Sequence, residues 1–405
     1  MLRKLPIDSL QPGMYITSVV QTGLDYPVLF SADVLLESAE EIEKIRSSGY
    51  TEAFVDLDRS DAQWRLLHGG SDDEAALRKA LSEPSKLTAI LPKVELHKEL
   101  PQARHIYTQT LHTAQRVMEA FKNTGEADIA AGSNAVEGIV ESVSRNANAL
   151  LAISKLRAKD NYTFSHCINV ATAAVIFAKH IGFEEAALKI IGLAGFFHDL
   201  GKMEIPLDIL NSPRKLTAEE FAVMRNHPSI GYAHLKKIPD LSDMVVRGAL
   251  EHHERINGKG YPDGKKGDEI GPAGKILAIV DVYDALSSRR VYKDPMAPHS
   301  ALGLLYGMRG EDFVPELVER FIQCIGIYPP GSLVQLNNDC LAVVSQVDPA
   351  SPLRPQLVLV RDPGGQVPPR TLIDLKLHET MLIKQCLDPR RYNLDPLSFL
   401  EQRAK

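Results

Sequence analysis

The sequence predicts a mainly α-helical protein with a small β-containing unit at each end. Apolar stripes with helical spacing begin after about residue 102, and the helical pattern continues to about residue 325. Short β-branched runs separated by turn residues occur before and after this stretch. We therefore expect a small α+β domain at 1–65, a linker at 66–101, a helical region at 102–326 and a small β-containing appendage at 327–405.

The N-terminal domain is predicted from three β-rich apolar runs around one helix. The runs cover residues 14–20, 27–36 and 52–57. Ser38 and Glu41 have the spacing of a capping box, and Gly49 can supply the left-handed residue that ends a helix. The residues that follow, 67–93, contain GGSDDE and two prolines, so we interpret them as a linker.

The helical region is predicted from apolar residues three or four positions apart. The first stripe comprises Tyr107, Leu111, Ala114, Val117, Met118 and Phe121, and the second comprises Val136, Ile139, Val140, Val143, Ala147 and Leu150. Further along, Gly182 interrupts one helix, and Thr217 and Glu220 have the spacing of another capping box. This pattern is typical of an all-α core.

The C-terminal appendage is predicted from short β-branched runs. Two or three strands are indicated by GSLVQLNNDCLAVVSQV and QLVLV, with an Asn-Asn-Asp turn and a Pro-rich loop between them.

Composition excludes several classes of protein. Lys and Arg number 46 against 52 Asp and Glu, without a long basic run, so we expect no binding of duplex nucleic acid. The four cysteines form no Cys-x-x-Cys pair, which argues against a zinc knuckle, a redox motif or a disulfide framework. The longest apolar stretch, 186–197, is interrupted by Lys189 and is too short to span a bilayer. We expect a cytoplasmic protein without a signal peptide or membrane insertion.

Histidines and aspartates in the helical region suggest a metal site. Five of the 13 histidines and two aspartates belong to this set: His166, His198, Asp199, His227, His252, His253 and Asp281. Imidazole is a common metal ligand, and carboxylates add charge that holds divalent ions. Any one of these histidines alone is better explained as a surface or helix-end residue. As a set, however, they would leave many polar groups unpaired within apolar helices, at roughly 1–3 kcal/mol each.

Lys202 lies near the same predicted site. It follows Asp199 by three residues and His198 by four, so its ammonium lies on the same helix face and could hold a phosphate oxygen. His180 stands where a helix ends, and we expect it to cap that helix. Six other histidines are expected to be structural: His68, His97, His105, His112, His234 and His299.

These motifs together resemble the HD-GYP family. The resemblance rests on HDLGK, the lone His166, His227, the HHE segment, GYP and DVYDAL, and it covers about residues 157–326. The family is the subset of HD-domain phosphohydrolases that hydrolyse the bacterial second messenger cyclic di-GMP. The opening KLPIDSLQPGMYI is similar to a small domain often found before HD-GYP domains.

The resemblance implies a two-metal centre on the ligand set given above, with Asp199 bridging the ions and Lys202 binding the scissile phosphate. Fe or Mn is the expected metal, and Ni, Co or Zn are alternatives. The ions would supply a metal-activated hydroxide. Some members hold a third metal with a glutamate one turn before the first histidine, but Tyr162 stands at that position here and Asp160 is at the wrong spacing.

The resemblance also implies substrate contacts. Arg290 and Lys293 correspond to a basic pair that contacts the substrate, although a solvated charge cluster at a helix end is the alternative. Asp284 is expected to orient a ligand histidine. Gly260, Tyr261 and Pro262 form the loop motif, in which Tyr261 would contact the substrate. A plain structural turn is the alternative for this loop, and Asn257 departs from a common aspartate.

The predicted function is therefore hydrolysis of cyclic di-GMP to pGpG, with further hydrolysis to GMP left open. Two alternatives stay open: a non-catalytic cyclic di-GMP sensor or scaffold, and a phosphohydrolase for another cyclic dinucleotide. The intact ligand set favours catalysis, because a sensor would not need every ligand. In the family the GYP loop is also linked to GGDEF-domain proteins, which are expected partners. A homodimer is left open.

Overall fold

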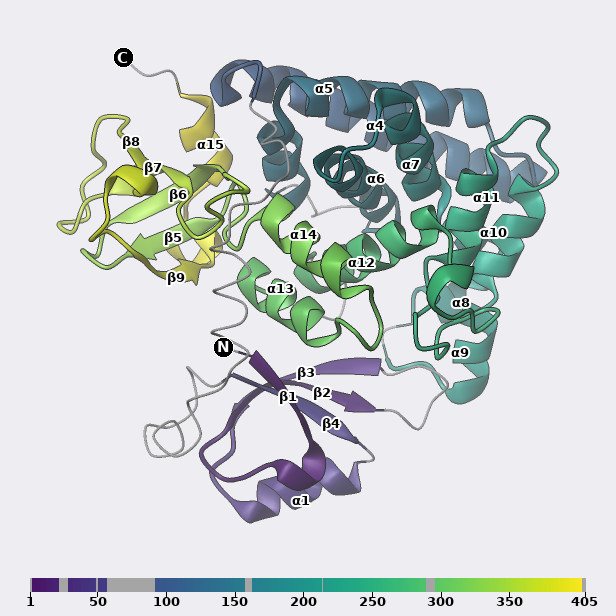
Figure 1. Cartoon of the computed structure of the whole chain (residues 1–405), viewed down its shortest axis with the longest axis horizontal. Coiled ribbons are helices and arrows are strands. Elements are labelled where there is room, and N and C mark those ends of the chain that lie inside the picture. The colour runs from purple at the N-terminus through teal and green to yellow at the C-terminus, as the bar shows by residue number, and fades with distance from the viewer. Residues whose placement is uncertain are drawn as a thin grey trace.

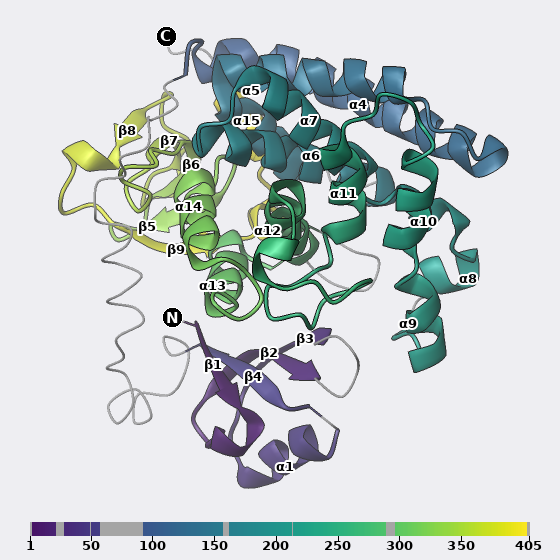
Figure 2. The same cartoon turned by 45° about the vertical axis from the view of Figure 1, so that its right-hand side comes forward.

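The computed structural model describes residues 2–21, 28–48, 50–56, 92–156, 162–212, 214–288 and 296–402. A helical body forms the centre of the molecule (Figure 1). Both views place the N-terminal sheet next to α13 and the C-terminal sheet next to α14 and α15 (Figure 2). The predicted class, mainly α with a small β-containing unit at each end, is confirmed.

The N-terminal unit is a four-stranded antiparallel sheet in the order β1-β4-β2-β3, with one α-helix. Its elements are β1 (Leu2–Pro6), β2 (Tyr15–Gln21), β3 (Val28–Leu35), α1 (Ala39–Ser47) and β4 (Glu52–Asp56). The sequence analysis missed β1, because LRKLP carries no β-branched residue.

The predicted capping box of α1 forms only in part. Ser38 Oγ accepts from the Glu41 amide at 3.4 Å, as expected. The Glu41 carboxylate, however, accepts from the amide of Glu37 rather than from that of Ser38. Gly49, the predicted stop, lies outside the described residues.

Phe54 in β4 joins this unit to the helical body. It is 2% exposed and packs in the core of the helical body rather than in the small core of the sheet. A Cβ on Gly307, the last residue of α13, would lie only 3.1 Å from the Phe54 ring. The two units are therefore in close apolar contact.

The helical body begins earlier than expected. Helix α4 starts at Leu96, upstream of the expected boundary at 102, and contains Pro101. Leu100 and Ala103 are fully buried on the core side of this helix. Their burial outweighs the hydrogen bond that a proline cannot donate, so the proline was a poor boundary signal here. Residues 66–91 of the expected linker, 66–101, lie outside the described residues.

Eleven α-helices are described between residues 96 and 325, apart from the gaps given above. They are α4 (Leu96–Thr124), α5 (Ile129–Leu156), α6 (Tyr162–His180), α7 (Glu185–Phe197), α8 (Leu207–Leu210), α9 (Ala218–Met224), α10 (His227–Leu235), α11 (Asp243–Glu251), α12 (Pro272–Ser287), α13 (Pro298–Gly307) and α14 (Pro315–Ile325). The predicted capping box of Thr217 and Glu220 is confirmed at the start of α9.

The core of this body surrounds α6, α7 and α12. Helices α4 and α5 pack against each other on one side of α6 and α7, and α11 packs against α7 and α12. Both predicted apolar stripes face this core, with Leu111 and Ala147 only partly buried. Among the described residues, no helix is both long and apolar enough to cross a bilayer.

The C-terminal unit is a five-stranded antiparallel sheet in the order β8-β7-β6-β5-β9. Its strands are β5 (Leu333–Leu336), β6 (Leu341–Gln346), β7 (Gln356–Arg361), β8 (Leu372–Asp374) and β9 (Ile383–Leu387), and α15 (Pro396–Glu401) follows. The sequence analysis missed β8 and β9, which are short, partly exposed edge strands. Glu401 in α15 forms an ion pair with Arg104 in α4.

Candidate metal centre

The HDLGK segment places two polar side chains at the end of a buried apolar helix. His198 and Asp199 directly follow Phe197, the last residue of α7. Their side chains are 0% and 1% exposed. Because water cannot reach them, their polar atoms need partners inside the protein or a bound ion.

Gly201 allows this segment to touch the start of α10. A Cβ on Gly201 would lie 2.1 Å from the carbonyl oxygen of His227 and 2.7 Å from the amide nitrogen of Gly231, so no larger residue fits. This close approach leaves Nε2 of His227 3.3 Å from Oδ1 of Asp199. The glycine thus positions one predicted ligand against another.

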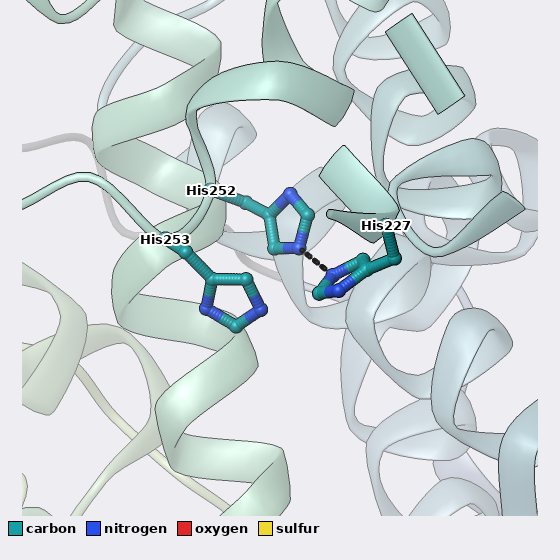
Figure 3. Close-up of side chains that lie close together, drawn as sticks. All are labelled: His227, His252 and His253. Carbon is teal, nitrogen blue, oxygen red and sulfur yellow. Dashed lines mark hydrogen bonds between the residues drawn. The ribbon is translucent and has the colours of Figure 1, made fainter. Parts of the chain in front are cut away.

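The two oxygens of Asp199 face different imidazoles. Oδ2 lies 3.2 Å from Nε2 of His198 and 3.6 Å from Nε2 of His166, which comes from α6. Oδ1 lies near His227 and 3.7 Å from Nε2 of His252, the C-cap of α11. Figure 3 shows His227 and His252 turned toward one another, with their Nε2 atoms 3.2 Å apart. One carboxylate therefore lies between two pairs of histidines.

Asp281 and His253 complete the cluster. Asp281, in α12, has Oδ1 3.0 Å from Nε2 of His166 and Oδ2 3.8 Å from Nδ1 of His253. The ring of His253 lies beside that of His252, with centroids 4.2 Å apart (Figure 3). The structure thus brings together every histidine and aspartate of the predicted ligand set.

Four of these imidazoles are oriented through Nδ1. The Nδ1 atoms of His198, His227 and His252 lie 2.7, 2.8 and 2.9 Å from backbone carbonyl oxygens. Nδ1 of His166 lies 2.7 Å from Oδ2 of Asp284, the residue expected to orient a ligand histidine. A ring that donates from Nδ1 keeps the lone pair of Nε2 for a metal. Metal-binding histidines typically make such a second contact.

The cluster contains polar atoms that the protein does not satisfy. Nε2 of His198 and Oδ1 of Asp199 are buried and have no hydrogen-bond partner among the described residues. His166, His198 and Asp199 offer ligand atoms within 4.8 Å of one another, and His227, His252 and His253 do the same. Imidazole nitrogens and carboxylate oxygens suit divalent transition metals. The donor set therefore fits a metal centre.

The electrostatics of the histidine doublet favour metal binding. Burial lowers the pKa of His252 and of His253 well below the ordinary value, and neighbouring imidazoles lower it further. Both rings are therefore neutral near pH 7, which is the form that binds a metal.

The pKa values of Asp199 and His166 are set by opposite charges as well as by burial. Burial acts to raise the pKa of Asp199, but His198 and Lys202 hold it well below its ordinary value. Burial also acts to lower the pKa of His166, yet Asp281 and Asp284 raise it to about 9. In the absence of a metal, a proton on His166 thus partly balances the carboxylates.

The HHE segment also fixes the GYP loop. The carboxylate of Glu254 is 1% exposed and accepts from the amides of Asp263, Gly264 and Lys265 at 2.8, 3.1 and 3.0 Å. A Cβ on Gly260 would lie 2.4 Å from the backbone nitrogen of Arg255, so this loop can cross the HHE segment only at a glycine.

Tyr261 packs against the histidine doublet. It is 5% exposed, and its ring stacks on His253 with centroids 4.6 Å apart. The guanidinium carbon of Arg225 lies 4.9 Å from the Tyr261 ring centroid. These contacts hold the Tyr261 ring against the histidine cluster, and its contact with substrate stays a prediction.

Other predicted residues have varied outcomes. Arg290, Lys293 and Asp160 lie outside the described residues, and Tyr162 is the first residue of α6, one turn before His166. The prediction for His180 is wrong: it ends α6, but it is buried and neither ring nitrogen has a partner among the described residues.

The histidines expected to be structural lie outside the cluster where they are described. His234 contacts the carbonyl oxygen of Gly125 and the carboxylate of Glu204. The sequence analysis assigned no site role to Glu254, Arg225 or Asn169, and it placed Tyr107 only in an apolar stripe. Only Glu254 carried a usable signal, since it directly follows the histidine doublet.

Comparison with known proteins agrees with this geometry. An HD domain family matches residues 143–317, a domain of unknown function (DUF3391) matches 2–131, and a KOW domain associated with HD domain matches 333–394. The DUF3391 match extends through α4, past the domain boundary expected from sequence.

Curated relatives include a cyclic di-GMP phosphodiesterase of Pseudomonas aeruginosa, 33% identical over 93% of this chain and 89% of the relative. A cyclic di-GMP phosphodiesterase response regulator of Xanthomonas campestris is 38% identical over 45% of this chain and 47% of the relative. A 3′3′-cGAMP-specific phosphodiesterase of Vibrio cholerae is 36% identical over 42% of this chain and 32% of the relative. Taken with the clustered histidines and aspartates, the nearly full-length match to the Pseudomonas protein shows that this chain belongs to the HD-GYP family of HD-domain phosphodiesterases.

Proposed function

We propose that this chain hydrolyses cyclic di-GMP to pGpG, and pGpG onward to GMP, at a centre of two divalent ions. The position of Asp199 carries the proposal. One of its oxygens faces His166 and His198, and the other faces His227 and His252. A carboxylate placed in this way can bridge two ions, each with its own imidazole ligands.

The proposed ligands are the clustered residues His166, His198, Asp199, His227, His252, His253 and Asp281. Fe or Mn suits this mixed set of nitrogen and oxygen donors, as do Ni, Co and Zn. Bound divalent ions supply hydroxide near neutral pH by lowering the pKa of water, and they neutralise charge on the phosphate. With Tyr162 one turn before His166, we propose two ions rather than three.

Lys202 is the proposed phosphate-binding residue. Its Nζ lies 2.6 Å from Oδ2 of Asp199, and its side chain is 22% exposed. The ammonium therefore lies at the edge of the buried cluster, where a phosphate oxygen could reach it. Arg290 and Lys293 are proposed to hold the substrate further from the reacting phosphate, since an Arg fork can grip phosphate or a guanine edge.

Cyclic di-GMP is the proposed substrate because the relative that matches nearly the whole chain is named for it. Another cyclic dinucleotide is a second candidate, since a relative named for 3′3′-cGAMP matches 42% of the chain. We also propose that the GYP loop contacts GGDEF-domain proteins, because Lys259, which directly precedes Gly260, is exposed.

A single experiment separates these functions. Protein purified without air or chelator is assayed for metal content and incubated with cyclic di-GMP, 3′3′-cGAMP or pGpG, and the products are identified by chromatography. We expect fastest turnover of cyclic di-GMP. Full metal content with no turnover of any substrate would instead support a sensor, and faster turnover of 3′3′-cGAMP would support the second substrate.

A further inference from the structure

A chain of buried hydrogen bonds leads from α4 to the proposed ligand His166. The hydroxyl of Tyr107 in α4 donates to Oδ1 of Asn169 in α6 at 3.1 Å. Nδ2 of Asn169 donates to Oδ1 of Asp284 in α12 at 3.1 Å, and Oδ2 of that carboxylate lies 2.7 Å from Nδ1 of His166. Tyr107, Asn169 and Asp284 are 1%, 5% and 7% exposed.

The chemistry of the chain fixes the direction of each hydrogen bond. The Asp284 carboxylate can only accept, so Asn169 must present its amino group to Asp284 and its carbonyl oxygen to Tyr107. The Tyr107 hydroxyl must then donate. At the other end, His166 donates from Nδ1 to Asp284, which leaves its Nε2 facing Asp199 and Asp281.

Tyr107 lies outside the HD domain match, which begins at residue 143. Its ring belongs to the predicted apolar stripe of α4 and is fully buried, so packing explains its size. Packing does not explain its hydroxyl, which Phe would lack at the same position. The hydroxyl has a defined partner in Asn169, whose amide it orients.

We propose that Tyr107 is a positioning residue for the metal centre and acts through Asn169 and Asp284 to hold the ring and tautomer of His166. The inference rests on the proposed function only in taking His166 as a metal ligand. Without the Tyr107 hydroxyl, the amide of Asn169 is free to turn and its bond to Asp284 weakens. Ser288, whose Oγ donates to the same Asp284 oxygen at 2.8 Å, keeps that carboxylate partly held.

The test measures metal affinity rather than turnover. Mn²⁺ binding to metal-free protein is measured by calorimetry for the wild type, Tyr107→Phe, Asn169→Leu and the double variant. Groups that orient metal ligands typically change affinity about 10–100-fold, and we expect Tyr107→Phe near the lower end of that range. In the Asn169→Leu background, Tyr107→Phe should change Mn²⁺ affinity little further, because Tyr107 acts on His166 through Asn169.

Ser142→Ala is the matched control. Its buried hydroxyl donates to Glu99 of α4 at 2.8 Å, so the variant loses a hydrogen bond to the same helix without touching the metal cluster. It should bind Mn²⁺ like the wild type. Melting of the metal-free proteins shows whether each variant is folded.

Two results would overturn the inference. One is wild-type Mn²⁺ affinity in Tyr107→Phe, and the other is additive losses in the double variant. Failure of the wild type to hydrolyse any cyclic dinucleotide would count against the proposed function alone, because the affinity comparison does not depend on turnover.

Discussion

Nζ of Lys202 lies 2.6 Å from Oδ2 of Asp199, the carboxylate oxygen that also faces His198 and His166. One carboxylate thus joins the buried imidazole cluster to a partly exposed cation. The contacts of these two residues predict different outcomes when each is changed.

Lys202→Ala should keep its metal and lose rate. Removing a cation beside the reacting phosphate should lower kcat by roughly 10²–10³-fold, by analogy with the loss of one charge-stabilising donor. Metal content and kcat for cyclic di-GMP are the measurements. Lys189→Ala, which removes a lysine paired with Glu137 on the surface, is the control. A wild-type rate in Lys202→Ala would remove Lys202 from the site.

Asp199→Asn should lose metal as well as rate. The substitution preserves shape but replaces one oxygen by a donor NH₂ and removes the charge between the two histidine pairs. We expect a loss of metal affinity larger than the roughly 10–100-fold typical of groups that only orient ligands. Elemental analysis after gel filtration measures it. Full metal occupancy in this variant would contradict a bridging role.

Gly201→Ala should disturb the metal centre although Gly201 has no side chain that could bind a metal. The added Cβ would meet the carbonyl oxygen of His227 at 2.1 Å, so the start of α10 must move. We expect unfolding free energy to fall by about 1–3 kcal/mol, together with weaker metal binding. Gly138→Ala is the control, since its Cβ would come no closer than 3.5 Å to Ile106. That helical change should be neutral or stabilising by up to about 1 kcal/mol. Equal effects of the two substitutions would be inconsistent with this account.

Glu254→Gln should loosen the GYP loop. Its Oε1 can still accept from Asp263 and Gly264, but the new NH₂ would face the amide of Lys265, which is also a donor. We expect a loss of about 1–3 kcal/mol and faster hydrogen exchange at Lys265. Glu269→Gln, at an exposed acceptor for Lys266, is the control. Unchanged protection of the loop amides from hydrogen exchange would show that Glu254 does not hold the GYP loop.

Metal removal should lower thermal stability without unfolding the protein at room temperature. The apolar core does not depend on an ion, whereas bound metal stabilises the native state by mass action, by about 2.7 kcal/mol at a hundredfold excess over Kd. A chelated sample should therefore keep its circular dichroism spectrum, and its Tm should rise with added Mn²⁺. A Tm that does not respond to Mn²⁺ would argue against a metal site.

Local patterns in the sequence predicted the helical body well. The stripes around Tyr107 and Val136 and the capping box at Thr217 depend on neighbouring residues, and all three appear in the structure. Elements with weak local signals were missed. Strand β1 is formed by its pairing with β4, and α4 continues through Pro101 because Leu100 and Ala103 are buried against distant helices.

The site residues could be predicted where neighbouring ligands form a short sequence motif. His198 and Asp199 adjoin in HDLGK, and His252 and His253 adjoin in HHE, so their convergence could be inferred. The supporting groups could not be found in this way. Asn169 has no distinguishing neighbour, and its role arises only because α4, α6 and α12 meet around it. Arg290 and Lys293 stay predictions from the resemblance.

The position of Phe54 affects how this enzyme can be shortened. Cutting the chain before α4 would remove the aromatic ring that packs beside Gly307 and would expose apolar surface at the end of α13 to water. Such a fragment would expose apolar surface that Phe54 covers in the intact chain. Poor solubility of an isolated helical domain would therefore reflect the loss of this cover and not a defect in its active site.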